Sequence, residues 1–199
     1  NLNYQYKFNE KGHKLDALLY YSHREGDNLE EVYEEMTDAD WNPVQTGYFR
    51  NQSGEDGVSN DYRLKIDYVN PFSEKGKIEA GYQMRSDIET EKFLYEDYDP
   101  DTHQWTENEN YSSEMDFSRT IHAVYTTFSN EIGGFQYQLG IRGEYTNRSI
   151  GDKQSGEDYI IDRFDFFPSV HVSRQIRKTY QLQASYSRRI DRPRGWFLE

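Results

Sequence analysis

Hydrophobic and polar residues alternate most regularly over residues 135–146, FQYQLGIRGEYT. The apolar residues of this stretch share one parity: Phe135, Tyr137, Leu139, Ile141 and Tyr145. Successive side chains of a β-strand point to opposite faces, so the pattern predicts a strand with one apolar and one polar face. Aliphatic residues lie in its middle and aromatic residues at its ends, as in strands that cross a bilayer. A soluble sheet that covers a protein core gives the same alternation, so this stretch leaves both environments open.

The same alternation recurs along the chain and predicts about eight strands, over residues 1–8, 13–23, 61–69, 77–86, 116–129, 135–146, 159–173 and 180–190. Between the first two strands, Asn9-Glu10-Lys11-Gly12 has the composition of a tight hairpin turn, with Gly12 where a positive φ is expected. Three more short turns are predicted over residues 70–76, 130–134 and 174–179. Neighbouring strands should therefore pair as antiparallel hairpins.

The remaining connections are longer and rich in acidic residues. We predict long loops over residues 25–60 and 87–115 and a medium loop over residues 150–158. Short and long connections thus alternate, which puts every long connection at the same end of the sheet. A soluble sandwich has no reason for this regularity, whereas an outer-membrane barrel has short turns on one side and long loops on the other. The pattern therefore favours a membrane barrel.

Composition agrees with a β-barrel and restricts the alternatives. The chain of 199 residues has 18 Tyr and 11 Phe but only 34% hydrophobic residues, and its mean hydropathy is −1.09. Tyr favours half-buried sheets and membrane interfaces, and a barrel exposes only alternate residues to lipid, so low hydropathy excludes helical spans alone. The net charge of −13 argues against a nucleic-acid partner, and the absence of cysteine excludes disulfides and thiolate metal sites.

We predict an all-β fold, an antiparallel meander of about eight strands that forms part of a transmembrane outer-membrane β-barrel. Two stretches carry a family resemblance: residues 167–173, FPSVHVS, together with residues 181–193, QLQASYSRRIDRP; and residues 139–146, LGIRGEYT. They resemble the barrel strands of TonB-dependent receptors, especially the outer-membrane β-barrel type common in Bacteroidetes. The sequence departs from that pattern at residues 194–199, RGWFLE, where family members usually have an aromatic residue and then Leu-Asn-Pro.

The resemblance implies a barrel of about 22 strands around an N-terminal plug. Residues 1–199 would then be a segment of a single barrel domain, with no plug domain in this chain. An eight-stranded barrel that closes on itself is the alternative, because eight strands can enclose a lumen filled with side chains. The partners implied are outer-membrane lipid, the TonB system acting through the plug, and a surface lipoprotein. The implied location is the outer membrane of a Gram-negative cell.

Two sets of candidate site residues follow from the pattern. Exposed loop aromatics are the ligand-contact candidates, because such surface is costly to leave uncovered: Trp41, Tyr48, Phe49, Tyr95, Tyr98 and Trp105. The alternative is that they pack against neighbouring loops. Polar residues of the inward parity should face a lumen or a plug: Arg63, Lys65, Gln83, Arg85, Arg142, Glu144, Gln181, Gln183 and Arg189. They could instead pair with one another across the wall.

Other chemistry has little support in the sequence. Asp97, Asp99 and Asp101 are spaced as in a calcium loop, but Thr102 and Asn108 stand where that loop needs Gly and Glu, so a solvated acidic loop is preferred. The five histidines have no metal-ligand spacing, and no nucleotide or nucleophile motif occurs, so we expect no cofactor and no enzyme activity. The function predicted is the barrel wall of a TonB-dependent receptor for nutrient uptake. The alternatives are a non-transporting scaffold barrel and a soluble β-barrel binding protein.

Overall fold

The computed structural model of the chain describes residues 1–177 and 179–190, apart from the side chains of residues 45–48 and 177. Its elements are all strands: β1 (Leu2–Lys7), β2 (Lys14–Thr37), β3 (Pro43–Pro71), β4 (Lys77–Asp99), β5 (Gln104–Glu107), β6 (Ser113–Ile132), β7 (Phe135–Asp152), β8 (Glu157–Arg177) and β9 (Tyr180–Ser187). No described segment forms a helix with the length and apolarity needed to cross a membrane.

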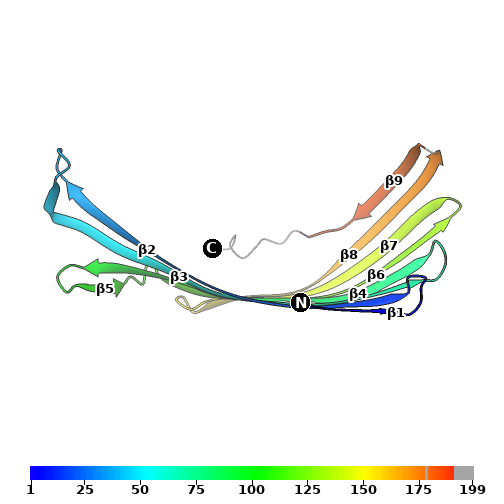
Figure 1. The fold of residues 1–199 in the computed structure, drawn as a ribbon, viewed down its shortest axis with the longest axis horizontal. Coiled ribbons are helices and arrows are strands. Elements are labelled where there is room, and N and C mark those ends of the chain that lie inside the picture. The colour runs from blue at the N-terminus through cyan, green and yellow to red at the C-terminus, as the bar shows by residue number, and fades with distance from the viewer. Residues whose placement is uncertain (178, 191–199) are drawn as a thin grey trace.

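The strands form one antiparallel sheet in which each long strand pairs with the next along the chain. The order is β1-β2-β3-β4-β6-β7-β8-β9, and the short β5 pairs with β4 beside this path. The sheet curves into an open trough, and β1 and β9 do not pair with each other within the described residues (Figure 1). The predicted meander is therefore confirmed, while the described part of the chain does not close into an eight-stranded barrel.

The predicted long loops are wrong, because most of these residues lie in strands. β2 and β3 pair from Lys14 opposite Val69 to Glu35 opposite Tyr48, which leaves only residues 38–42 as the turn. In the same way β4 extends to Asp99 and β7 to Asp152. Hydrogen bonds between the backbones of two strands do not depend on alternating side chains. The strands therefore continue to pair beyond the residues whose side chains alternate, although water covers both of their faces there.

These extensions give the trough two different ends. The turns that follow β1, β3, β6 and β8 are short and gather at one end, which we call the short-turn end; the hairpins β2–β3, β4–β5 and β7–β8 project at the other, the hairpin end (Figure 1). Gly12, Gly133 and Gly134 at the short turns have φ values of 90°, 60° and 78°, which a residue without Cβ adopts freely. The positive φ predicted for Gly12 is confirmed.

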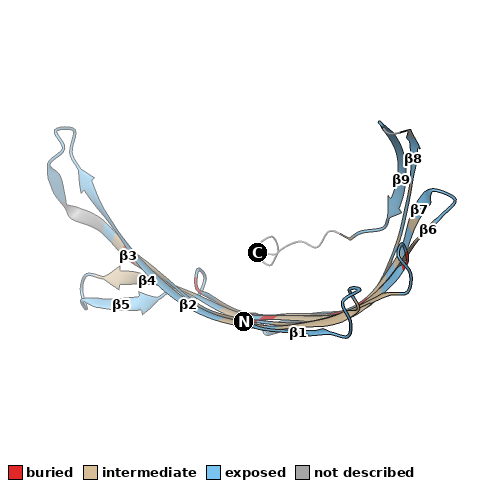
Figure 2. Ribbon diagram, turned by 45° about the vertical axis from the view of Figure 1, so that its right-hand side comes forward, coloured by how far each residue is buried: buried red, intermediate tan, exposed pale blue. Residues whose placement is uncertain are grey.

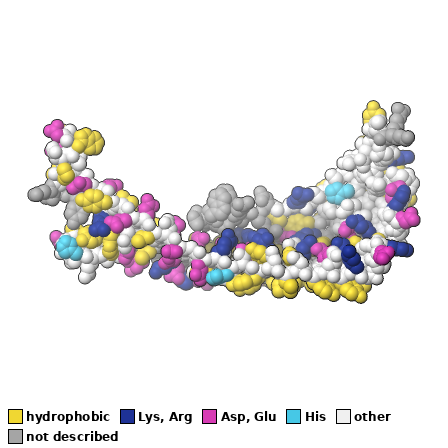
Figure 3. All heavy atoms as spheres, viewed as in Figure 1, with side chains coloured by type: hydrophobic (Ala, Val, Ile, Leu, Met, Phe, Trp, Pro, Cys, Tyr) yellow, Lys and Arg dark blue, Asp and Glu magenta, His cyan; other side chains and the backbone are white. Residues whose placement is uncertain are grey.

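The sheet has one apolar and one polar face over the half nearest the short turns. Residues that lie opposite each other on neighbouring strands share a face, and one such row holds Tyr4, Ala17, Ile66, Tyr82 and Val124. In Figure 3 hydrophobic side chains cover the convex underside of the trough in this half, and Lys and Arg side chains lie on its concave side. The alternate parity therefore gives an apolar belt outside and a polar wall inside.

Burial is inverted relative to a water-soluble domain. Among the described residues Ala123 is the one hydrophobic residue classed as buried, while Asp61, Asp87, Glu144 and Thr146 are buried on the concave face. The apolar belt is open to its surroundings: the exposed fractions include 53% for Leu19, 46% for Leu139 and 54% for Phe166. Figure 2 shows intermediate burial in the middle of the sheet and exposure at its edges and hairpins. So continuous an apolar surface would be costly in water, which indicates that something apolar covers it.

Candidate functional site: the concave wall and the projecting hairpins

The predicted inward row lies on the concave face. Arg63 is directly opposite Arg85 on the neighbouring strand, and Lys65 is opposite Gln83. The other members share this face through the register of β4, β6, β7, β8 and β9, namely Arg142, Glu144, Gln181 and Gln183. Arg189 follows the end of β9, so no strand pairing defines its face. The sequence pattern thus identified one contiguous wall.

Several members of this wall pair with carboxylates. Arg142 donates from Nε to Glu144 Oε1 at 2.5 Å and from Nη2 to Gln83 Oε1 at 3.2 Å. The Lys65 ammonium lies 2.7 Å from Asp67 Oδ2. Both ion pairs join residues two apart on one strand, and the bond from Arg142 to Gln83 joins different strands. All three occupy donors that would otherwise face the lumen.

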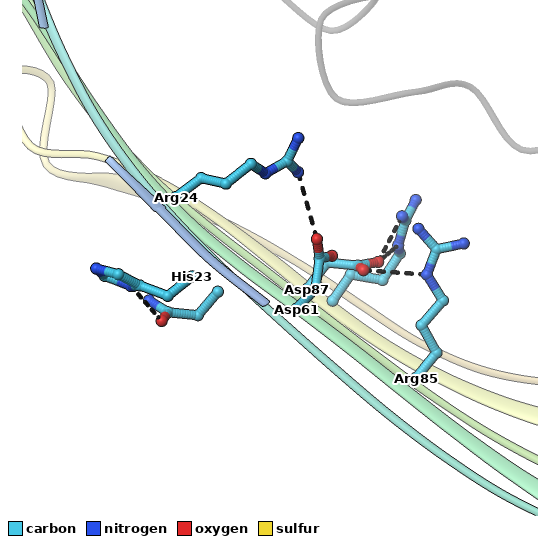
Figure 4. Close-up of polar contacts among 7 residues, drawn as sticks. His23, Arg24, Asp61, Arg85 and Asp87 are labelled. Carbon is cyan, nitrogen blue, oxygen red and sulfur yellow. Dashed lines mark hydrogen bonds and ion pairs between the residues drawn. The ribbon is translucent and has the colours of Figure 1, made fainter. Parts of the chain in front are cut away.

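Two buried carboxylates form a cluster that the sequence analysis did not identify. Asp61 and Asp87 lie opposite each other on β3 and β4, and the side chain of Asp87 is only 3% exposed. Arg119 donates to Asp87 Oδ2 from Nη2 at 2.6 Å and from Nε at 3.1 Å, and Arg85 Nε donates to Oδ1 at 3.0 Å. Arg24 Nη2 donates to Asp61 Oδ2 at 3.3 Å (Figure 4). A buried carboxylate is tolerated only with such partners, so each arginine here stabilises the wall.

Tyr125 also stabilises the concave face. The hydroxyl of Tyr125 donates to Asp67 Oδ1, and the Arg142 guanidinium carbon lies 5.4 Å from the Tyr125 ring centroid. The ring lies over Gly81, where an added Cβ would stand 2.4 Å from Tyr125 Cζ. Glycine is required at this position because the ring crosses directly above its backbone.

The candidate ligand-contact aromatics divide into packed and exposed groups. Tyr98 and Trp105 contact each other with centroids 5.1 Å apart, and the Arg50 guanidinium carbon lies 4.8 Å from the first ring and 5.1 Å from the second. Tyr95 packs against Tyr111, with centroids 5.2 Å apart. These three candidates therefore pack within the hairpins.

The remaining candidates lie on the β2–β3 hairpin. Trp41 is 84% exposed at its tip and has a φ of 64°, and Phe49 is 48% exposed. The side chain of Tyr48 is outside the described residues. Trp41 and Phe49 are the two candidates that the structure leaves accessible to another molecule.

The three aspartates of the weak calcium candidate make local contacts. Asp97 Oδ2 accepts from Asn108 Nδ2 at 2.8 Å, and Asp99 accepts from the Asp101 amide at 2.9 Å and the Thr102 hydroxyl at 2.8 Å. These bonds hold the pKa of the Asp99 carboxyl below its usual value, with the Thr102 contact the largest cause. Within the described residues, no three His, Asp or Glu side chains are placed to share a metal ion.

Comparison with protein families decides what covers the apolar belt. The model of the outer membrane protein beta-barrel family matches residues 6–199. The chain belongs to this family. It is an outer-membrane β-barrel chain, so its convex belt faces lipid and its concave wall faces the barrel interior. The alternative of a soluble β-barrel binding protein is therefore wrong.

A solved structure shows the same fold in a larger barrel. The ferric citrate transporter FecA, in a crystal structure of its unliganded form, matches this barrel chain with a TM-score of 0.56 and 14% sequence identity. The match covers 92% of this chain and 25% of that chain, so the barrel chain spans about a quarter of the transporter. No curated protein matches the sequence.

The residues missed by sequence analysis had a detectable signal. Asp61 shares the parity of Arg63 and Lys65, and Asp87 shares that of Gln83 and Arg85. Asp61 lies inside the predicted strand 61–69 and Asp87 lies one residue beyond the predicted strand 77–86, so parity assigns both to the barrel interior. Their meeting across β3 and β4 depends on register, which the alternation does not give.

Proposed function

We propose that this barrel chain forms part of the wall of a TonB-dependent outer-membrane receptor that imports a nutrient. The main support is the arrangement of the sheet, with an apolar belt on the convex face and a charged, hydrogen-bonded wall on the concave face. Such a wall suits a wet or plugged interior. The FecA likeness supports the transporter class through the fold alone.

In this proposal residues 1–199 are one segment of a single barrel domain. Other strands of the same barrel would pair with β1 and β9, and a plug moved by the TonB system would close the lumen. The hairpin end would face the outside of the cell, because outer-membrane barrels have their long connections there. Trp41 and Phe49 on the β2–β3 hairpin would then contact the incoming ligand or a surface lipoprotein. We expect no catalysis by this wall.

The proposal is tested by uptake in the bacterium that makes the protein. Strains lacking the full-length gene, lacking TonB, or lacking neither are compared for uptake of a panel of iron chelates, cobalamin and oligosaccharides. Loss of the same solute in both deletion strains supports the receptor. An unchanged panel in the gene deletion strain contradicts it, and envelope defects together with unchanged uptake would indicate the scaffold function instead.

A further inference from the structure

Charge is divided unequally between the hairpins and the wall. Residues 25–60, 89–116 and 150–162 hold 24 of the 36 acidic residues and three of the 23 basic residues, a net charge of −21. The rest of the chain holds 20 basic and 12 acidic residues, a net charge of +8. The belt on the convex face is apolar, so much of this positive charge lies on the concave face (Figure 3). The wall of this acidic protein is therefore positively charged.

Arg63 is a wall residue whose positive charge has no carboxylate partner within the described residues, and Arg85 lies beside it. They lie directly opposite each other on β3 and β4, an arrangement that is unfavourable for like charges. Within the described residues Arg63 makes no ion pair, and its buried Nε has no hydrogen-bond acceptor. The guanidinium carbon of Arg63 lies 5.3 Å from the centroid of the Tyr20 ring, which supports one face of the group. Because Nε is buried, a solute could reach this guanidinium only through its terminal nitrogens, which make no hydrogen bond within the described residues.

The carboxylates nearby do not meet that need. Asp87 and Asp61 are held by Arg119, Arg85 and Arg24. With Arg63, and with Arg148 opposite Arg119, this part of the wall has five guanidinium groups and two carboxylates. Arg85 uses Nε for Asp87, and within the described residues its two terminal nitrogens have no hydrogen-bond partner. Its side chain is 41% exposed on the concave side. Donors of two arginines are therefore available at one place.

We propose that Arg63 and Arg85 bind a small solute that carries a carboxylate or phosphate group. A guanidinium presents parallel N–H donors that match the oxygens of either group. Arg63 is next to Tyr62, which lies at the hairpin end of the apolar belt, so the pair lies at the level where the wall leaves the membrane. The inference deepens the proposed uptake function, because it names the chemical class of the ligand.

The acidic hairpins do not prevent an anion from reaching this pair. Asp56 lies seven positions from Arg63 along β3. This is about 23 Å at the rise of a β-strand, well beyond the Debye length of about 8 Å at physiological ionic strength. Glu89 is nearer on the concave face. It lies opposite Ser59, four positions from Arg63 along β3, or about 13 Å, which is still beyond the Debye length.

The test measures binding of succinate and of inorganic phosphate to the full-length protein in detergent by isothermal titration calorimetry. The variants are Arg63→Gln, Arg63→Lys and the matched control Arg163→Gln. Arg163 also lies on the concave face, but it is bonded to Asp165 at 2.7 Å and 3.0 Å and is three strands from Arg85, about 14 Å at the usual spacing of strands. A thermal melt checks that each variant is folded, and Arg85→Gln replaces Arg63→Gln if that variant fails to fold.

The expected result is binding of at least one anion by the native protein and weakening by about tenfold or more in Arg63→Gln, with the control within about twofold. Arg63→Lys keeps the positive charge but loses the paired N–H donors of the guanidinium, so its affinity should lie between those of the native protein and Arg63→Gln. The proposal is overturned if neither anion binds, as when a carboxylate of the same protein occupies the pair, or if Arg63→Gln binds like the control. Calorimetry measures binding without the TonB system, so its result does not depend on whether the uptake test succeeds or fails.

Discussion

Leu139 and Gln138 are adjacent in β7 but meet different environments. Leu139 is 46% exposed on the convex face and pairs with Val170, whereas Gln138 is on the concave face opposite His171. The first faces hydrocarbon and the second faces the barrel interior, where Arg142 is already accommodated. We expect Leu139→Arg to lower the free energy of unfolding by about 2–4 kcal/mol, and Gln138→Arg to change it little.

Denaturant titration of the full-length protein in lipid vesicles measures both values. A lipid-resident quencher gives a second readout, since it should reach a fluorophore attached at position 139 and miss one at position 138. Equal costs for the two arginines, or equal quenching, would contradict the assignment of the faces.

Gly81 supports a second prediction at the scale of one residue. A Cβ there would stand 2.4 Å from Tyr125 Cζ, so Gly81→Ala must displace the ring and weaken its bond to Asp67. We expect a loss of about 1–3 kcal/mol in the free energy of unfolding. Gly57→Ala is the matched control, because no atom lies within 4 Å of its added Cβ. A cycle with Tyr125→Ala assigns the cause: the cost of Gly81→Ala should fall sharply once the ring is gone, and an unchanged cost would show that the ring is not responsible.

At the scale of the elements, the sequence predicted the half of each strand that crosses the membrane. Alternation was visible there because one face meets lipid and the other meets the interior, as for Tyr62, Leu64, Ile66 and Tyr68 in β3. It vanished in residues 25–37, where both faces of β2 are exposed and no parity has to be apolar. The candidate wall was found through parity for the same reason. The Asp61–Asp87 cluster was not found, because its contacts depend on which residues the register places opposite each other.

The turn at the tip of the β2–β3 hairpin depends on one carboxylate. Asp38 Oδ1 accepts from the amides of Asp40 and Asn42, both at 2.9 Å, and the Asn42 side chain donates to Oδ2 at 3.1 Å. These bonds, those from Asn42 foremost, hold the pKa of the Asp38 carboxyl below its usual value. The stabilisation is therefore complete above the unfolded pKa of about 3.9 and is lost as the pH falls through the lower folded value.

Hydrogen exchange across residues 38–42, corrected for the intrinsic rate, measures this effect. Asp38→Ala should reduce protection at pH 7, and the native turn should approach the variant only at pH values below about 3.9. Asp40→Ala is the control, because its side chain accepts none of the turn hydrogen bonds. Loss of protection at a higher pH, or equal effects of the two variants, would contradict the role of Asp38.

For the whole molecule, the arrangement of connections predicts which end faces the outside. Residues 1–199 contain no cysteine, so a cysteine introduced at one position is the single thiol of this segment. Asp40→Cys and Thr102→Cys at the hairpin end should react with a membrane-impermeant maleimide on intact cells. Glu10→Cys and Glu74→Cys at the short-turn end should react only after the outer membrane is permeabilised. Equal labelling of both ends on intact cells would refute this orientation.

The order of strands in the sheet has a consequence for how the wall is assembled. Every long strand pairs with the next long strand in the sequence, and the short β5 pairs with β4 beside this path. Among the described strands, none lies between two strands that precede it in the sequence. Pairing can therefore start at a short turn and advance residue by residue, so each step closes only a small loop and loses little chain entropy. Each new hairpin adds to an edge that is already in place. The wall can grow one hairpin at a time from either edge, so a defect in one hairpin stops growth there while the pairs already formed stay intact.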